Sequence, residues 1–157
     1  MSSHSRSQLA APKNLGFSLV EIVVAVTLLG MGAAFAVPRF TTLANRTRAS
    51  EVLALSNELR SAVEAAHSQF VAAGSHLSAA SLNRKAVALK NGYPEASAGG
   101  IGNAIINWGG FTTKTTSSFV VFFKTGAPSD SQCSVTYKAA PEPAIAAVIT
   151  DINISGC

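Results

Sequence analysis

The chain has 157 residues, of which 48% are hydrophobic and only 13% are charged, and its formal net charge is +4. Soluble domains usually carry about a quarter charged residues, so this deficit indicates a long uncharged segment. The basic residues are not interleaved with aromatic ones, which argues against a nucleic-acid-binding surface, and no nucleic acid partner is expected. The length allows one modest domain with an appended segment.

Residues 1–16 are polar and basic and show neither helical nor strand periodicity. They include Arg6 and Lys13, and without these two cations the formal charge falls from +4 to +2. A basic segment directly before an apolar run is typical of an export leader. Residues 1–16 are therefore predicted to be the charged part of an export leader, and the position of the cleavage site is open at this point.

Residues 17–37 contain a single charged residue, Glu21. As a helix, these residues would reach about 31 Å, and the hydrocarbon core of a bilayer is about 30 Å thick. The segment is therefore predicted to be a transmembrane helix. An ionised side chain deep in a bilayer costs roughly 2.5–3.5 kcal/mol, so we expect Glu21 either to have a partner or to reach water near the membrane surface.

Two interpretations of the leader compete. In an ordinary secretory leader, residues 22–31 form the apolar region and AFA, ending at Ala36, forms the cleavage site, which would release a secreted binding domain. Against this interpretation, Glu21 stands at the entrance to the apolar region, and the helical pattern continues across the proposed cut. The second interpretation retains the apolar helix.

The second interpretation is favoured by the sequence GFSLVEIVVAVTLLGMGAAFAVPRF, which resembles the signature of type IV prepilins. The resemblance implies cleavage after Gly16 by a prepilin peptidase and N-methylation of the new amino terminus at Phe17. It also implies that Glu21 of one subunit pairs with the Phe17 amine of its neighbour during filament assembly. Gly30 and Pro38 fall where that family commonly has helix-weakening residues.

After Pro38 the helical pattern resumes, with apolar residues at spacings of three or four: Leu55, Leu59, Val63, Ala66 and Phe70. Glu51, Glu58, Arg60 and Glu64 occupy other faces. We predict one long helix over residues 17–73. Its first half, residues 17–37, is apolar all round; its second half, residues 38–73, is amphipathic and is ended by Gly74.

Residues 74–157 are predicted to form a small globular head. The sequence RKAVALKNGYP predicts a strand that runs into an Asn91–Gly92 turn, and a short helix is expected around residues 104–108. Three further strands are predicted at residues 117–124, 132–138 and 144–152, separated by turns rich in glycine and proline. An antiparallel sheet of three or four strands packed on the helix makes the fold class α+β.

The two cysteines, Cys133 and Cys157, lack the spacing of a metal site. In an exported protein they predict one disulfide, which closes a loop of about 25 residues and contributes about 3 kcal/mol. His4, His67 and His76 do not cluster and are each expected at the surface, so no metal, cofactor or enzymatic activity is predicted. Trp108 and Tyr93 are either packing residues or an exposed aromatic contact.

The head narrows the resemblance. The sequences NGYPEASAGGIGNAI and CSVTY, with the final cysteine, are similar to pilins of the mannose-sensitive haemagglutinin (MSHA) type. This implies a pilin ladle fold and a structural subunit that polymerises into a surface filament for attachment. Implied partners are copies of itself, a prepilin peptidase, an assembly ATPase, a platform protein and a secretin. The implied location is the inner membrane of a Gram-negative bacterium before assembly and the extracellular pilus afterwards. Alternatives are a minor pilin or a type II secretion pseudopilin.

Overall fold

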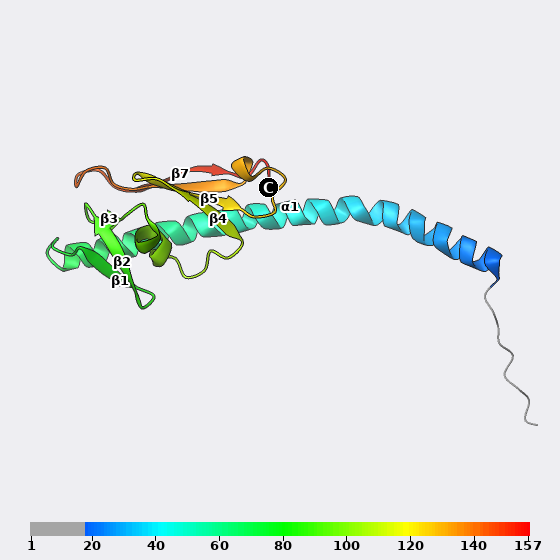
Figure 1. The fold of residues 1–157 in the computed structure, drawn as a ribbon, viewed down its shortest axis with the longest axis horizontal. Coiled ribbons are helices and arrows are strands. Elements are labelled where there is room, and N and C mark those ends of the chain that lie inside the picture. Colours follow the sequence, from blue (N-terminus) through cyan, green and yellow to red (C-terminus); the bar gives the residue numbers. More distant parts are fainter. Residues whose placement is uncertain (1–17) are drawn as a thin grey trace, which may run out of the picture. The chain divides into compact units, whose positions relative to one another are not determined.

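The computed structural model describes residues 18–157, except for the side chains of residues 35–39. The chain divides after Phe40 into two units, and residues 41–157 form the larger one, called here the compact unit. One helix, α1 (Leu19–Ala72), contributes to both (Figure 1). In the compact unit α1 packs against antiparallel sheets, so the predicted α+β class is confirmed.

The C-terminal end of α1 is fixed by a glycine. Gly74 has a φ of +72°, which glycine adopts without steric cost. The N–H of Ser75 donates to the carbonyl oxygen of Phe70, and the N–H of Gly74 donates to that of Val71. This pair of hydrogen bonds is the Schellman motif, which satisfies carbonyl groups left over at a helix end. The predicted stop at Gly74 is confirmed.

The buried face of α1 follows the predicted spacing. Its buried side chains in the compact unit are Val52, Leu55, Ser56, Leu59, Ala62, Val63 and Ala66. Phe70, also predicted in this stripe, is half-buried and lies against Gly92. Residues at spacings of three and four share one face of a helix, so a single stripe covers the sheets.

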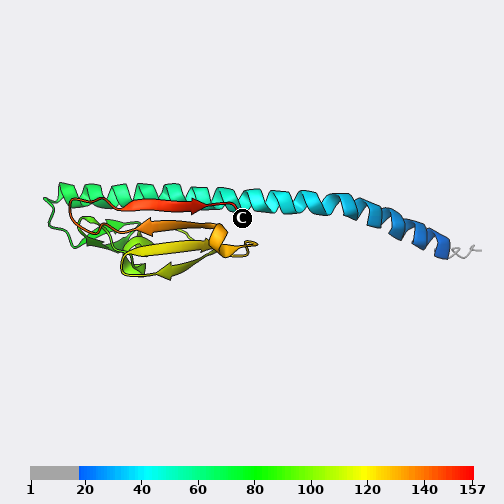
Figure 2. The ribbon, with the colours of Figure 1, turned by 90° about the horizontal axis from the view of Figure 1, so that it is seen from above.

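Within residues 18–157, seven strands form two antiparallel sheets. The first sheet has the order β1-β2-β3, and the second has the order β4-β5-β6-β7. Their bounds are β1 (Ala79–Leu82), β2 (Lys85–Lys90), β3 (Tyr93–Pro94), β4 (Phe111–Thr115), β5 (Phe119–Lys124), β6 (Ser134–Lys138) and β7 (Val148–Asn153). Figure 2 shows β7 running along α1 in the compact unit, with β6, β5 and β4 following in turn.

Three of the predicted strands correspond to β5, β6 and β7, and the strand that runs into the Asn91–Gly92 turn is β2. The short helix predicted around residues 104–108 is wrong. An irregular helical segment lies earlier, at Ala98–Gly102, where the Ser97 hydroxyl accepts a hydrogen bond from the N–H of Gly100. A Cβ at Gly100 would lie 2.3 Å from the carbonyl oxygen of Glu95, so this close backbone approach requires glycine.

Tyr137 links the two sheets through the core. Its ring is fully buried, and its hydroxyl donates a 2.6 Å hydrogen bond to the carbonyl oxygen of Pro94 in the first sheet. Burial raises the pKa of the Tyr137 hydroxyl well above its ordinary value of 10.0, and repulsion from Tyr93 raises it further. The hydroxyl therefore stays protonated in the folded chain after the unfolded chain has begun to lose the proton.

The Tyr137 hydroxyl predicts an alkaline loss of stability. Above about pH 10 the unfolded state binds fewer protons than the native state, so the free energy of unfolding should fall by up to about 1.4 kcal/mol per pH unit. Tyr137→Phe should remove this part of the slope and cost about 1 kcal/mol at neutral pH, where the hydrogen bond is lost. Urea unfolding of both chains at several pH values measures both effects. If the free energy of unfolding of the variant still fell as steeply with pH above about pH 10, a group other than Tyr137 would be responsible for the effect.

Candidate assembly site

The N-terminal part of α1 exposes apolar side chains on every side. Every described side chain from Ser18 to Ala34 is exposed. The large apolar ones are Leu19, Val20, Ile22, Val23, Val24, Val26, Leu28, Leu29 and Met31, and Leu29 is 74% exposed. A helix that is apolar all round is normally covered by other molecules, because so much exposed apolar surface is unfavourable in water. This segment is therefore the candidate assembly site.

The membrane prediction is not supported by the structure. Within the described residues, no helix combines the length and the apolar composition that crossing a membrane requires. The predicted span, residues 17–37, begins at a residue outside the described part, and the side chains of residues 35–37 are also outside it.

Glu21 lies in the first turn of α1 and is exposed. The helix begins at Leu19, and the N–H of Ile22 donates to the carbonyl oxygen of Ser18. Ser18 therefore precedes the helix and Glu21 is its third residue, the Ser-x-x-Glu spacing of a capping box. A negative charge in a first turn also interacts favourably with the helix dipole. Glu21 thus has a local role available besides pairing with another subunit.

The remaining predicted residues of this region are only partly described. Gly16 and Phe17, the predicted cleavage and methylation positions, lie outside the described residues. α1 is continuous through Gly30 and Pro38, and apart from the chain neighbours and nearby backbone of the helix itself, no heavy atom lies within 4 Å of the Cβ position at Gly30. The side chain of Pro38 is not described. Helix weakening at these two positions stays a prediction.

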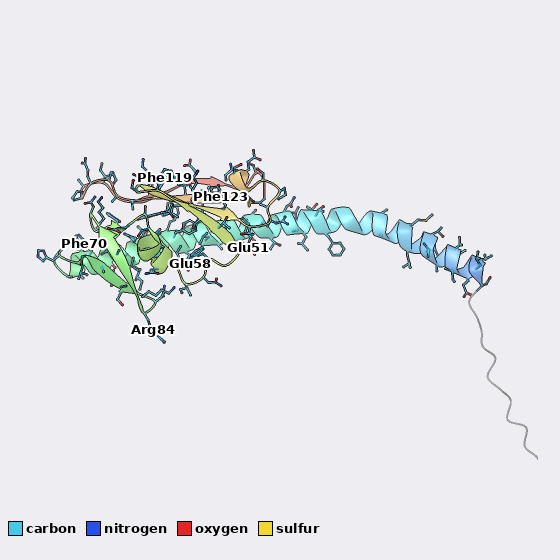
Figure 3. All side chains as sticks on the ribbon, viewed as in Figure 1. Glu51, Glu58, Phe70, Arg84, Phe119 and Phe123 are labelled. Carbon is cyan, nitrogen blue, oxygen red and sulfur yellow. A yellow bond between two sulfur atoms is a disulfide. The ribbon has the colours of Figure 1, made fainter. Side chains whose placement is uncertain are left out.

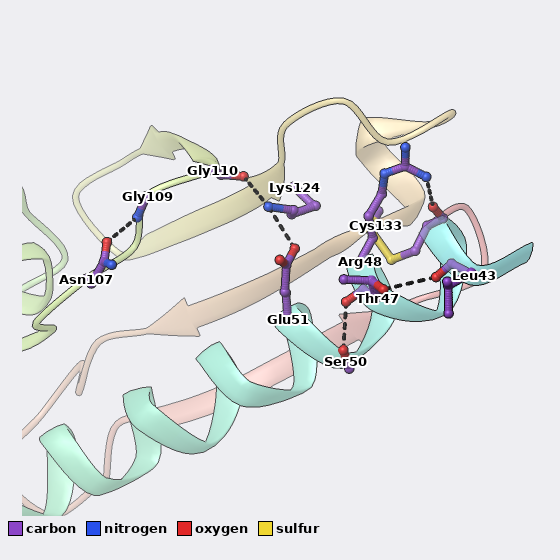
Figure 4. Close-up of polar contacts among 11 residues, drawn as sticks. Leu43, Thr47, Arg48, Ser50, Glu51, Asn107, Gly109, Gly110, Lys124 and Cys133 are labelled. Carbon is purple, nitrogen blue, oxygen red and sulfur yellow. Dashed lines mark hydrogen bonds and ion pairs between the residues drawn. A yellow bond between two sulfur atoms is a disulfide. The ribbon is translucent and has the colours of Figure 1, made fainter. Parts of the chain in front are cut away.

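In the compact unit, Lys124 of β5 joins α1 to the second sheet. Its Nζ lies 2.8 Å from Oε2 of Glu51 and donates a 3.0 Å hydrogen bond to the carbonyl oxygen of Gly110 (Figure 4). The ammonium group also lies 4.9 Å from the centre of the Phe111 ring. The Lys124 side chain is 12% exposed, whereas Glu51 is 45% exposed, so solvent partly screens the pair.

Replacing Lys124 is expected to destabilise the compact unit modestly. Lys124→Met keeps the apolar length of the side chain but removes the ion pair and the hydrogen bond, at an expected cost of about 1–2 kcal/mol. Urea unfolding measures this cost. Lys114→Met is the matched control, because Lys114 is an exposed lysine on the adjacent strand β4. Equal midpoints for the two variants would contradict the role of Lys124.

A second contact fixes the segment between η1 (Ala98–Gly102) and β4. Oε1 of Glu58 accepts a 2.8 Å hydrogen bond from the backbone N–H of Ile106, and the Asn107 side chain accepts one from the N–H of Gly109. Figure 3 shows Glu51 and Glu58 along the same stretch of α1. Sequence reasoning placed both carboxylates on faces other than the apolar stripe and did not predict these contacts.

A disulfide and an arginine hydrogen bond both hold Cys157, and backbone hydrogen bonds join the neighbouring Gly156 to Gln132 and Ser129. Cys133 and Cys157 form a disulfide with a Cα–Cα distance of 4.8 Å, and both residues are buried. Nη1 of Arg48, on α1, donates a 3.1 Å hydrogen bond to the carbonyl oxygen of Cys157 (Figure 4). The end of the second sheet is thereby attached both to β6 and to the helix.

The aromatic residues singled out from the sequence lie in separate contacts. Trp108 is half-buried and packs edge-to-face on Phe122, with ring centres 6.2 Å apart. Tyr93 stacks on His67 at 4.2 Å, and Nδ1 of His67 lies 3.0 Å from the carbonyl oxygen of Gly92. The expectation that His67 is a surface residue is therefore wrong, because stacking and hydrogen bonding hold it half-buried.

Comparison with known families gives one match. Residues 12–37 match the family model of the prokaryotic N-terminal methylation motif. The matched range contains Gly16, Phe17, Glu21 and Gly30 and ends before Pro38. The motif supports a type IV pilin-like precursor, a class of structural rather than catalytic proteins processed by a prepilin peptidase. No curated protein matches the chain significantly, and no solved structure does.

Proposed function

We propose that this chain is a subunit of a type IV pilus. It is cleaved after Gly16, methylated at the amino group of Phe17, and polymerises through the apolar part of α1. The observation that carries the proposal is that the methylation motif at residues 12–37 coincides with a helix whose apolar side chains are exposed on every side. Assembly with other copies would cover that surface.

The proposed assembly step is an ion pair between subunits. Cleavage creates a positive amine at Phe17, about one helical turn from Glu21. A carboxylate surrounded by apolar helices is unfavourable alone, and pairing with the amine of a neighbouring copy offsets much of that cost. Because each copy offers a different surface to the next one, the contact repeats without closing and gives a filament.

Among type IV pilins, we further propose that this chain is an MSHA-like major pilin used for attachment. The similarity of the sequence of residues 74–157 to MSHA-type pilins supports this proposal. The proposed partners are the prepilin peptidase, the assembly ATPase, the platform protein and the secretin, with passage from the inner membrane to the cell surface. A minor pilin or a type II secretion pseudopilin carries the same kind of leader. Abundance separates these roles, because a major pilin dominates the filaments sheared from cells.

The intact mass of the mature protein tests the proposal. A chain that begins at methylated Phe17 is 20 residues and one methyl group heavier than a secreted domain that begins at Val37. We expect the heavier species in sheared surface material. A mature protein that starts at Val37 would overturn the pilin assignment and support release of a soluble binding domain.

A further inference from the structure

We propose that a cavity of about 560 Å³ between the two sheets binds a saccharide that carries a carboxylate group. The cavity is lined by Lys90 at the end of β2, Lys138 at the end of β6, and residues 95–97, 117–118 and 139–141. Its size falls in the range of small-molecule sites. The proposal deepens the attachment role put forward above, but the binding measurement does not depend on filament formation.

The charges that line the cavity indicate the ligand's chemistry. Lys90 and Lys138 are exposed, and among the described residues neither ammonium group has an ion-pair or hydrogen-bond partner. Two cations on one cavity repel each other, and an anion placed between them removes that repulsion. Glu95 also lines the cavity, so the formal charges of the three charged lining residues sum to +1.

The presence of Glu95 favours an anionic ligand that also carries hydroxyl groups over a simple inorganic anion. Its carboxylate repels a bare inorganic anion but accepts hydrogen bonds from hydroxyl groups. Ser117 and Ser118 add exposed hydroxyls, and the Ser97 hydroxyl, which accepts from the N–H of Gly100, still has its own proton to donate. A ligand that offers both a carboxylate and several hydroxyls matches this set of groups, and such a ligand is an acidic sugar.

The cavity wall is fixed by the backbone. The N–H of Ala139 donates to the carbonyl oxygen of Ser118, and Nδ2 of Asn91 donates to that of Ala140. The N–H of Glu95 donates to the carbonyl oxygen of Ala88 in β2. Ala96 and Ala140 are buried, and together with Pro141 they give an apolar surface for the carbon-bound hydrogens of a sugar ring. Little ordering is therefore required when a ligand binds.

Figure 3 labels Phe119, which is the first residue of β5. Phe119 pairs in register with Lys138 and directly follows Ser118. Three strand ends, those of β2, β5 and β6, therefore meet around one opening. Strand ends in a sheet are rigid supports for side chains, which is favourable for a binding site.

The test is a titration of the full-length mature chain by isothermal calorimetry with 3′-sialyllactose, a glucuronate disaccharide and neutral lactose. We expect at least one acidic sugar to bind with a dissociation constant on the order of 1 mM, and lactose to bind at least about tenfold more weakly. The two acidic sugars distinguish a sialic from a uronic acid source. Equal binding of acidic and neutral sugars, or no binding of either acidic sugar, would overturn the proposal.

Variants identify the site. The double variant Lys90→Ala/Lys138→Ala should weaken the acidic sugar at least about tenfold. The matched control Lys85→Ala/Lys114→Ala removes two exposed lysines of β2 and β4 that do not line the cavity, and should stay within about twofold of the parent chain. Equal losses in the two double variants would show general attraction to positive charge and overturn the site.

Glu95→Gln tests whether the ligand is a sugar or a simple anion. Removing this carboxylate should weaken the acidic sugar, because hydroxyl hydrogen bonds are lost, and strengthen inorganic sulfate, because repulsion is lost. Stronger binding of both probes, or sulfate that competes as well as the sugar, would overturn the saccharide assignment. These measurements do not need filaments. A failed binding test would therefore leave the pilin assignment unaffected, and a failed pilin assignment would leave the measured binding unaffected.

Discussion

A Glu21→Ala chain is expected to be produced and processed at the parental level and to form no filaments. The substitution removes the only charge between Leu19 and Ala34, so the apolar segment becomes more apolar but loses its proposed partner for the Phe17 amine of the next subunit. An amine left unpaired among apolar helices costs several kcal/mol, enough to prevent addition of subunits. Immunoblots of sheared and whole-cell fractions, with electron microscopy of the cells, measure the outcome.

The capping-box spacing at the start of α1 provides a competing explanation for Glu21, and Glu21→Gln separates the two. Glutamine serves in a capping box as glutamate does, but it carries no charge. If the helix start is the reason for the residue, the glutamine chain should assemble. If pairing is the reason, the glutamine chain should fail in the same way as the alanine chain, which is the result we expect.

Glu64→Ala is the matched control for both variants. Glu64 lies on the same helix, is exposed, and has no ion-pair partner among the described residues. Its loss should leave filaments at the parental level. Normal filaments from Glu21→Ala would refute the pairing role, whatever the control does.

The long helix could be predicted from sequence because each of its signals is local. The four-residue spacing of Leu55, Leu59 and Val63 fixes its buried face, and Gly74 supplies its end. The strands β5, β6 and β7 are rich in β-branched and aromatic residues and are separated from one another by glycine- or proline-containing turns, so they too could be predicted. In contrast, β4 has the sequence FTTKT, whose last four side chains are exposed, and its pairing with β5 is what makes it a strand.

The contacts of the compact unit could not be predicted because they join residues that are distant in sequence. Glu58 meets Ile106 48 positions further on, and Arg48 meets Cys157 109 positions further on. Helical periodicity shows only that these side chains lie beside the buried stripe. The cavity could not be predicted for the same reason, because its lining residues Lys90 and Lys138 are distant in sequence and belong to different sheets.

Two of these distant contacts act on the same end of the chain. The disulfide attaches Cys157 to Cys133, and Arg48 attaches the same residue to α1. If the disulfide is opened, the residues after β7 are held by the Arg48 hydrogen bond and by the backbone hydrogen bonds of Gly156 with Gln132 and Ser129. With the covalent link removed, each remaining contact carries more of the attachment of this edge strand, so the disulfide and Arg48 should support each other.

Opening the disulfide is therefore expected to destabilise the compact unit strongly. A loop of about 25 residues gives an expected loss of about 3 kcal/mol, which lowers the urea midpoint by about 1–2 M. Measurements on the oxidised and the reduced parental chain give this difference without any substitution. Cys133→Ala/Cys157→Ala should match the reduced chain apart from the small change in packing at two buried positions. Arg48→Met should cost more in the reduced chain than in the oxidised one, because the covalent link at that end is then gone and fewer contacts hold it. Equal costs in both chains would show that the two attachments are independent.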